Sequence, residues 1–232
     1  TLSVGKNCKI NILKFKVNKL EIYLSECGMG NVNAAFNLTL IINQIAIDQI
    51  ILIGVGGALD TSLNIGDMVI SDSVIQHDYY SSLDDGNFLM KPGDLILSTE
   101  QYQNYCPIIK SNDSLIEIDA IAQQNKNYRV GKIASGNEFV GTTARKNIVN
   151  EITAGAILVD MEASAISYIA HKNSIPFLVT KTVSDRLLSD GSIESDFKQF
   201  LDCASENAAC IVTDIIHYYK KKVNFHVTKP TQ

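Results

Sequence analysis

The sequence lacks several features that define whole classes of protein. No apolar run approaches the roughly 18 residues that a membrane-spanning helix needs, and no charged-then-apolar leader opens the chain. The five cysteines form no C-x-x-C pair and no histidines have metal-ligand spacing, so we expect neither a disulfide framework nor a metal site. G-x-S-x-G, G-x-G-x-x-G and P-loop spacings are also absent. We therefore expect a cytoplasmic protein that uses no cofactor.

The charge balance argues against large polyanionic partners. The chain has 25 acidic and 20 basic residues, a formal net charge of -5, and the charges are scattered rather than grouped. Nucleic acids and anionic membrane surfaces attract basic patches instead. We therefore expect no nucleic acid and no membrane partner, and a small polar substrate stays open.

The hydrophobic pattern predicts the strands of a sheet. Alternating apolar residues between positions 10 and 24 indicate a β-hairpin. The continuous apolar run at 50–55, closed by Gly56, indicates a strand that is buried on both faces, as in a parallel sheet. Further strands are expected at 68–75, 129–135, 156–160 and 177–183.

Helical periodicity appears between these strands. Apolar residues at i, i+3, i+4 and i+7 indicate amphipathic helices over 32–40, from Ala163 to a point before Pro176, and over a long closing stretch at 194–215. Residues 79–113 turn polar and predict a long surface excursion with some helix near 98–105.

Together these elements predict one α/β domain in which helices flank a central mixed, twisted sheet. We expect the domain to span residues 1–221 and residues 222–232 to form a loose tail. The chain begins at Thr1 in a strand-like pattern without an initiator methionine. A further strand and loop are therefore expected upstream of residue 1.

Three acidic residues follow predicted strands: Asp160, Glu162 and Asp185. Open α/β sheets bind ligands at the carboxyl ends of their strands, so acids on two strand ends can face one pocket. Each acid also has an ordinary interpretation. Glu162 precedes a helix whose backbone N–H groups could satisfy it, and Asp185 could be a turn residue. Both interpretations stay open on the pattern alone.

The His77-Asp78 pair could support acid–base chemistry, but a polar pair at a strand end more often fixes a loop. We expect the second role. The glycines at 54, 56 and 57 let the backbone approach a ligand closely or simply allow a tight turn.

Four segments resemble, in order, the nucleoside phosphorylase and nucleosidase superfamily, specifically the methylthioadenosine/S-adenosylhomocysteine nucleosidases. They are Gly28-Met29-Gly30-Asn31-Val32, Gly54-Val55-Gly56-Gly57-Ala58-Leu59 running to Ile65-Gly66-Asp67, Ser135-Gly136-Asn137-Glu138-Phe139-Val140, and Val159-Asp160-Met161-Glu162-Ala163 followed by Thr182-Val183-Ser184-Asp185. The resemblance implies a three-layer architecture. It also implies hydrolysis of the N-glycosidic bond of 5′-methylthioadenosine or S-adenosylhomocysteine to adenine and the thioribose.

The resemblance assigns different tasks to two acids. Asp185, oriented by Ser184, would donate a proton to N7 of the departing adenine, provided that burial keeps its carboxyl group protonated near neutrality. Glu162 would accept hydrogen bonds from the ribose hydroxyls and favour the cationic transition state. Met161 would pack on the sugar.

Other residues are implied to contact the base and the alkylthio group. Phe139 would stack on the purine while the backbone of Val140 reads its edge, and Phe197 would line the alkylthio side. Members of this family are commonly dimers.

The chain departs from the family around the attacking water. The Ala-Met-x-x-Glu-type segment whose acid activates that water has no match, so it lies upstream of Thr1 or is absent. Val55 stands where the family usually has serine, and Lys181 stands where it usually has arginine. We expect both, with Gly56, to line the substrate site.

Three alternatives to this function stay open. A phosphorylase would need cationic side chains around phosphate, but the chain has only three arginines, which favours water as the nucleophile. A member that binds nucleosides without cleaving them would explain the missing acid. A sister nucleosidase would act on another adenine nucleoside, such as aminodeoxyfutalosine.

A dimer contact can be sought in the predicted surface excursion. The loop that contains Phe88, Met90 and Pro92 is our candidate for the contact in a homodimer. The same three residues could equally fold the loop onto its own domain.

Overall fold

A computed structural model describes residues 2–4, 8–17, 20–112, 128–188 and 192–195, together with single residues at 206, 209, 210, 213, 216 and 217. Phe197 and the predicted tail at 222–232 lie outside these residues. Among the described helices, none is both long enough and apolar enough to cross a membrane.

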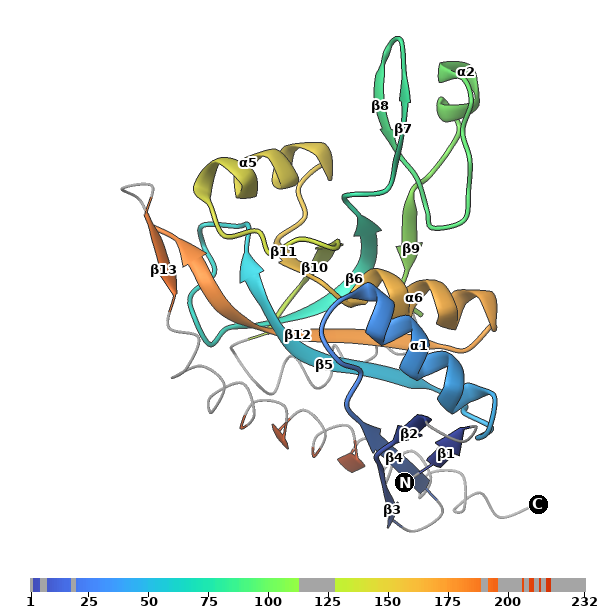
Figure 1. Cartoon of the computed structure of the whole chain (residues 1–232). Helices are drawn as coiled ribbons and strands as arrows, with labels where there is room; N and C mark the ends of the chain where they lie inside the picture. Colours follow the sequence, from blue (N-terminus) through green and yellow to red (C-terminus); the bar gives the residue numbers. More distant parts are fainter. Residues whose placement is uncertain are drawn as a thin grey trace, which may run out of the picture.

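A mixed seven-stranded sheet forms the centre of the domain, in the order β13-β12-β5-β11-β10-β6-β9 (Figure 1). Its strands are β5 (Ile50–Ala58), β6 (Met68–Gln76), β9 (Ile108–Lys110), β10 (Tyr128–Ser135), β11 (Leu158–Asp160), β12 (Phe177–Leu187) and β13 (Ile193–Ser195). The long strands β5 and β12 pair in parallel, whereas β12 also pairs with β6 in the antiparallel direction. This extra pairing closes the strands from β12 to β6 into a ring.

Within the described residues, four helices accompany the sheet: α1 (Asn31–Ile42), α2 (Thr99–Tyr102), α5 (Thr143–Ile152) and α6 (Ala163–Lys172). Helices α1 and α6 pack against each other, and Figure 1 shows them side by side next to β5 and β12. The carboxamide oxygen of Asn31 ties the two together, since it accepts hydrogen bonds from Ser164 Oγ at 2.7 Å and from the Ala165 N–H at 3.1 Å. The predicted α/β fold is therefore confirmed.

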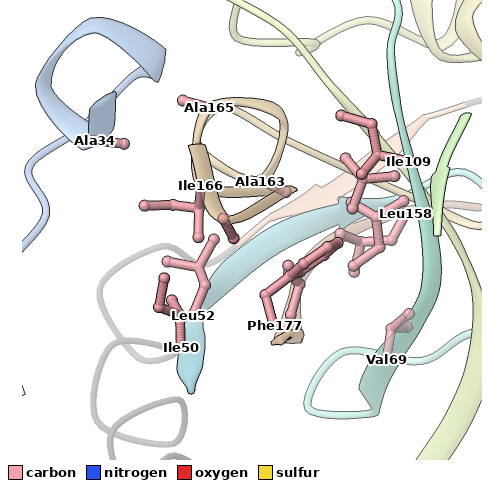
Figure 2. Close-up of a cluster of buried hydrophobic side chains, with 14 of the residues drawn as sticks. Ala34, Ile50, Leu52, Val69, Ile109, Leu158, Ala163, Ala165, Ile166 and Phe177 are labelled. Atoms are coloured by element: carbon pink, nitrogen blue, oxygen red, sulfur yellow. The ribbon is translucent and has the colours of Figure 1, made fainter. Parts of the chain in front are cut away.

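The core lies between α6 and the sheet. Figure 2 shows Ile166 of α6 pointing toward Leu52 and Ile50 of β5, with Phe177 of β12 and Leu158 of β11 in the same buried cluster. Fully burying an aliphatic or aromatic side chain of this size contributes about 1.5–3 kcal/mol. The apolar runs that predicted β5 and β12 are thus the strands that hold the site in place.

The N-terminal hairpin is confirmed as β3 (Ile12–Val17) and β4 (Leu20–Ser25). A second small sheet, β1 (Leu2–Val4) with β2 (Cys8–Ile10), precedes it and was not expected. Both lie near the N-terminus, beside the start of β5 in Figure 1.

Two predicted regions differ from the structure. The excursion at 79–113 contains the expected helix α2, but also a hairpin of β7 (Tyr80–Leu83) with β8 (Gly86–Leu89) and the sheet strand β9. The hairpin closes at Gly86, whose φ of 134° suits glycine. The closing helix was predicted to begin at 194, but Glu194 belongs to β13, which pairs with β12. Helix α5 was not predicted.

Candidate active site

Two glycines of β5 make room for charged side chains from β12. A Cβ atom added at Gly54 would lie 3.0 Å from Lys181 Nζ, and one added at Gly57 would lie 2.8 Å from Asp185 Oδ2. At Gly57 the contact is closer than real Cβ atoms make, and at Gly54 it is tighter than most of them, so a side chain at either position would displace the charged group that faces it. The glycine-rich end of β5 therefore serves as the floor of a site where charged groups approach the backbone.

The first group of charges surrounds Lys181, and we call it the sugar-side cluster: Lys181, Asp160 and Glu162. The Lys181 ammonium lies 2.7 Å from Asp160 Oδ2 and 3.0 Å from Glu162 Oε2. The other oxygen of Glu162, Oε1, accepts a hydrogen bond from the Gly30 N–H at 2.8 Å. Gly30 precedes α1 and has a φ of 87°, so the turn before α1 holds Glu162 in place.

The sugar-side cluster carries surplus negative charge. Burial by itself would lower the pKa of Lys181, but the neighbouring Asp160 and Glu162 carboxylates outweigh burial and raise that pKa. The lysine therefore stays positively charged. One ammonium group faces two carboxylates, which leaves the cluster with one net negative charge.

The ordinary interpretation of Glu162 does not hold. Glu162 occupies the N-cap position of α6, yet its side chain makes no capping hydrogen bond. Asp160 performs that task, since its carboxylate accepts from the Ala163 N–H at 3.0 Å. The Glu162 carboxylate is thus left to face Lys181 and Gly30.

The second group of charges surrounds Asp185, and we call it the base-side pair: Asp185 and Lys146. Asp185 is only 6% exposed, Lys146 is 0% exposed, and Lys146 Nζ pairs with Asp185 Oδ2. Ser184 Oγ lies within hydrogen-bond distance of Asp185 Oδ1, at 3.0 Å, and the orienting role that the resemblance implies for Ser184 stays a prediction. Lys146 Nζ also donates to the Ala58 carbonyl oxygen at 3.2 Å.

Lys146 is the member of the site that the sequence did not reveal. It lies in the first turn of α5, whose N-cap Thr142 accepts from the Arg145 N–H. The signal that could have found it is the capping threonine, Thr142, followed by Lys146 and Val149 at a spacing of three residues. This spacing places both side chains on one face of the helix, and both are buried.

The two groups of charges lie at two positions along β5. Gly54 marks the sugar-side cluster and Gly57 marks the base-side pair, and three residues of strand span about 10 Å. Gly56 lies between them and accepts a hydrogen bond from Ser184 Oγ at 3.2 Å through its carbonyl oxygen. Val55 and Met161 are half-buried beside them.

The segment predicted to hold the purine is only partly enclosed. Val140 is buried, whereas Phe139 is 75% exposed, so its stacking role stays a prediction. The loop is anchored by Asp78, whose Oδ2 accepts from the Asn137 N–H at 2.6 Å and from Asn137 Nδ2 at 3.0 Å. The loop-fixing role expected for the His77-Asp78 pair is thus confirmed for Asp78.

His77 lies beneath the same loop. It is buried, and neither ring nitrogen has a hydrogen-bond partner among the described residues. Burial lowers the pKa of His77, although the Asp78 and Glu138 carboxylates partly oppose this. His77 is therefore neutral at pH 7.

A sequence model of the phosphorylase superfamily matches residues 2–217. The chain therefore belongs to the phosphorylase superfamily. A 5′-methylthioadenosine/S-adenosylhomocysteine nucleosidase of Staphylococcus haemolyticus (strain JCSC1435) is 34% identical over 207 residues, which cover 89% of this chain and 86% of that protein. Within the superfamily, the chain is thus a member of the methylthioadenosine/S-adenosylhomocysteine nucleosidase family, as the sequence resemblance implied.

Solved structures agree with this placement. The nucleosidase of Neisseria meningitidis in complex with methylthio-immucillin-A is 27% identical, with a TM-score of 0.74 over 93% of this chain and 87% of that chain. The nucleosidase of Helicobacter pylori shares the fold at 22% identity, with a TM-score of 0.76 over 92% of this chain and 86% of that chain.

Proposed function

We propose that this protein is a purine nucleosidase that hydrolyses the N-glycosidic bond of 5′-methylthioadenosine and S-adenosylhomocysteine. The observation that carries the proposal is the pair of charged groups over the β5 glycines, with one surplus negative charge on one side and a proton-bearing pair on the other. The nucleosides named for the Staphylococcus haemolyticus relative are the substrates we expect. They would place the enzyme in methionine salvage in the cytoplasm.

Glycosidic cleavage needs both kinds of group. Adenine leaves poorly until N7 gains a proton, and the sugar passes through an oxocarbenium-like state as the bond breaks. The base-side pair supplies the proton, which typically contributes about 10²- to 10⁴-fold in rate. The sugar-side cluster binds the ribose hydroxyls through Glu162, and its surplus negative charge stabilises the developing cation.

Water is the nucleophile that the charges favour over phosphate. The described cation nearest the sugar, Lys181, is already matched by Asp160 and Glu162, so an incoming phosphate would meet net negative charge. The direct test is release of free adenine from 5′-methylthioadenosine with and without inorganic phosphate. We expect equal rates in both. A requirement for phosphate would instead identify a phosphorylase, and binding without turnover would identify a nucleoside-binding protein.

We also propose that the enzyme is a homodimer. An exposed apolar stripe begins at Met29, just before α1, and continues along the helix through Val32 and Phe36. Val32 is 79% exposed. Beside the stripe a cavity of about 240 Å³ is lined by Val32, Pro92 and Tyr168 among others. Such apolar surface is typical of subunit contacts. Sedimentation should show a dimer at micromolar concentration, and Val32→Asp should shift it to monomer.

The loop that was our candidate for the dimer contact packs largely within itself. Met90 is buried, and its sulfur accepts a hydrogen bond from the Ile96 N–H at 3.3 Å. The Phe88 ring lies 4.7 Å from the Tyr102 ring. Only Pro92, at the cavity beside α1, lies next to the apolar stripe. We therefore favour α1 over this loop as the contact surface.

A further inference from the structure

We propose that Lys146 stores the proton that the leaving adenine receives, and that it acts through Asp185 as a positioning residue. The inference rests on the proposed nucleosidase function. It assigns a role to a lysine that lies outside every motif described above.

Both oxygens of Asp185 face hydrogen-bond donors. Oδ2 contacts the Lys146 ammonium, and Oδ1 lies 3.0 Å from Ser184 Oγ, whose single proton has the Gly56 carbonyl oxygen at 3.2 Å as its other acceptor. An ammonium group has protons to give and no lone pair with which to accept one. In an ion pair of these two side chains the ammonium is the donor and the carboxylate is the acceptor, so the transferable proton lies on Lys146. The sequence hypothesis had placed that proton on Asp185 through burial alone.

The position of Lys146 is costly for a purely structural lysine. A fully buried ammonium loses its hydration, and a buried ion pair is often no more stabilising than apolar residues of similar volume. Here the backbone is also adapted to the pair, because a Cβ at Gly57 would lie 3.1 Å from Lys146 Nζ. Lys146 Nζ has two described acceptors, the Asp185 carboxylate and the Ala58 carbonyl. Only the carboxylate can pass a proton on to a base.

The transfer balances without any further reactant. As the C1′–N9 bond breaks, its electron pair moves onto adenine and makes N7 more basic. One Nζ–H bond of Lys146 breaks and its proton moves to Asp185, while Asp185 delivers a proton to N7. Asp185 ends unchanged and Lys146 is left as a neutral amine. The amine regains a proton after product release, which matches the proton lost by the attacking water.

The test compares two leaving groups. Adenine needs a proton to depart, whereas the p-nitrophenolate of a p-nitrophenyl riboside does not. We expect Lys146→Met to lower kcat for 5′-methylthioadenosine by about 10²-fold or more, while its rate with the p-nitrophenyl riboside stays close to wild type. The ratio of the two rates comes from one sample, so a partly unfolded variant lowers both rates equally and leaves the ratio unchanged.

A second variant gives the answer with the natural substrate alone. Arginine keeps the positive charge and the donors at this position, but it does not release its proton in proteins. Lys146→Arg should therefore lose adenine release as Lys146→Met does. The matched control is Lys132→Met, which removes an ammonium that donates to the Thr153 carbonyl at 2.8 Å, and it should leave both rates unchanged.

The possible outcomes separate the two proposals. Equal losses of Lys146→Met on both substrates, or full adenine release by Lys146→Arg, would overturn the role of Lys146 and leave the nucleosidase function standing. A wild-type protein that cleaves neither substrate would overturn the proposed function itself, and the inference with it.

Discussion

Two buried lysines lie over the same strand, but they have different partners. Lys181 contacts two carboxylates, those of Asp160 and Glu162 at 2.7 and 3.0 Å. Lys146 contacts one carboxylate, that of Asp185, and fills its second contact with a neutral backbone carbonyl. The sugar-side cluster is therefore negative, and the base-side pair is neutral.

This difference matches the two halves of the proposed reaction. A permanent negative charge stabilises a cationic sugar, and it must not be lost to a proton. The raised pKa of Lys181 shows how strongly its two acids hold that lysine in the charged form. A single ammonium–carboxylate pair has no surplus charge, so moving a proton out of it creates less electrostatic imbalance. The number of acids around each lysine thus separates a fixed charge from a proton source.

The largest expected effect is on the base side. Asp185→Asn removes the group that we propose protonates N7, so we expect kcat for adenine release to fall by about 10²- to 10⁴-fold while folding is retained. Steady-state rates and a denaturation curve measure both. Asp84→Asn, in the exposed β7–β8 turn, is the matched control and should keep wild-type activity. Near-normal turnover by Asp185→Asn would reject the assignment.

The sugar side should respond more in stability than the base side. Lys181→Met leaves Asp160 and Glu162 without their cation, and removing one partner of a buried pair typically costs about 3–5 kcal/mol. The free energy of unfolding in urea should fall by this order, with Lys132→Met as the control. Adding Asp160→Asn to Lys181→Met should recover part of the loss, because one uncompensated charge disappears. If Lys181→Met alone is as stable as the wild type, the sugar-side cluster is not held together by charge.

Glu162→Gln tests the surplus charge itself. The variant keeps a Lys181–Asp160 pair of zero net charge, so the positive sugar loses its electrostatic stabilisation. We expect kcat to fall by about 10²-fold, the scale typical for one oriented electrostatic group. Glu151→Gln, at the exposed end of α5, is the matched control. If Glu162→Gln raises KM but leaves kcat unchanged, Glu162 binds the ribose without favouring the transition state.

Much of the fold could be predicted because its central strands are long and apolar. The apolar residues at 50–55 and 177–183 predict the strands Ile50–Ala58 and Phe177–Leu187, and the helices packed on them show a clear periodicity. The β7–β8 hairpin escaped prediction because its short strands, Tyr80–Leu83 and Gly86–Leu89, contain as many polar and small residues as apolar ones. Helix α5 escaped because Lys146 interrupts its buried face where an apolar residue would be expected.

The residues of the site divide in the same way, into those that a local sequence pattern predicts and those that it does not. The carboxylates were found because acids at strand ends are a local signal, readable from a few consecutive residues. Their cations were harder to place, since Lys146 lies 39 residues from Asp185 and Lys181 lies 19 from Glu162. Lys181 was recognised only as a departure from the family. A partner fixed by tertiary structure leaves no pattern in one sequence.

His77 extends the comparison to a buried titratable group that forms no hydrogen bond with an acid among the described residues, and its effect should be the smallest. Its Nδ1 lies 3.9 Å from Glu138 Oε1. Burial lowers its pKa below the ordinary 6.5, although Asp78, Glu138 and Asp160 oppose the shift and Arg145 supports it. Below pH 6.5 the unfolded chain therefore binds a proton that folded His77 does not, so the free energy of unfolding falls as the pH decreases. His77→Gln should reduce this acid-side loss between pH 7.5 and 5.5 in urea unfolding, and it should change adenine release far less than Asp185→Asn. His171→Gln, on the exposed side of α6, should keep the wild-type loss. An unchanged pH slope in His77→Gln would mean that folded His77 takes up its proton as readily as the unfolded chain does. A hydrogen bond to an acid would then not be the feature that distinguishes the two lysines from His77.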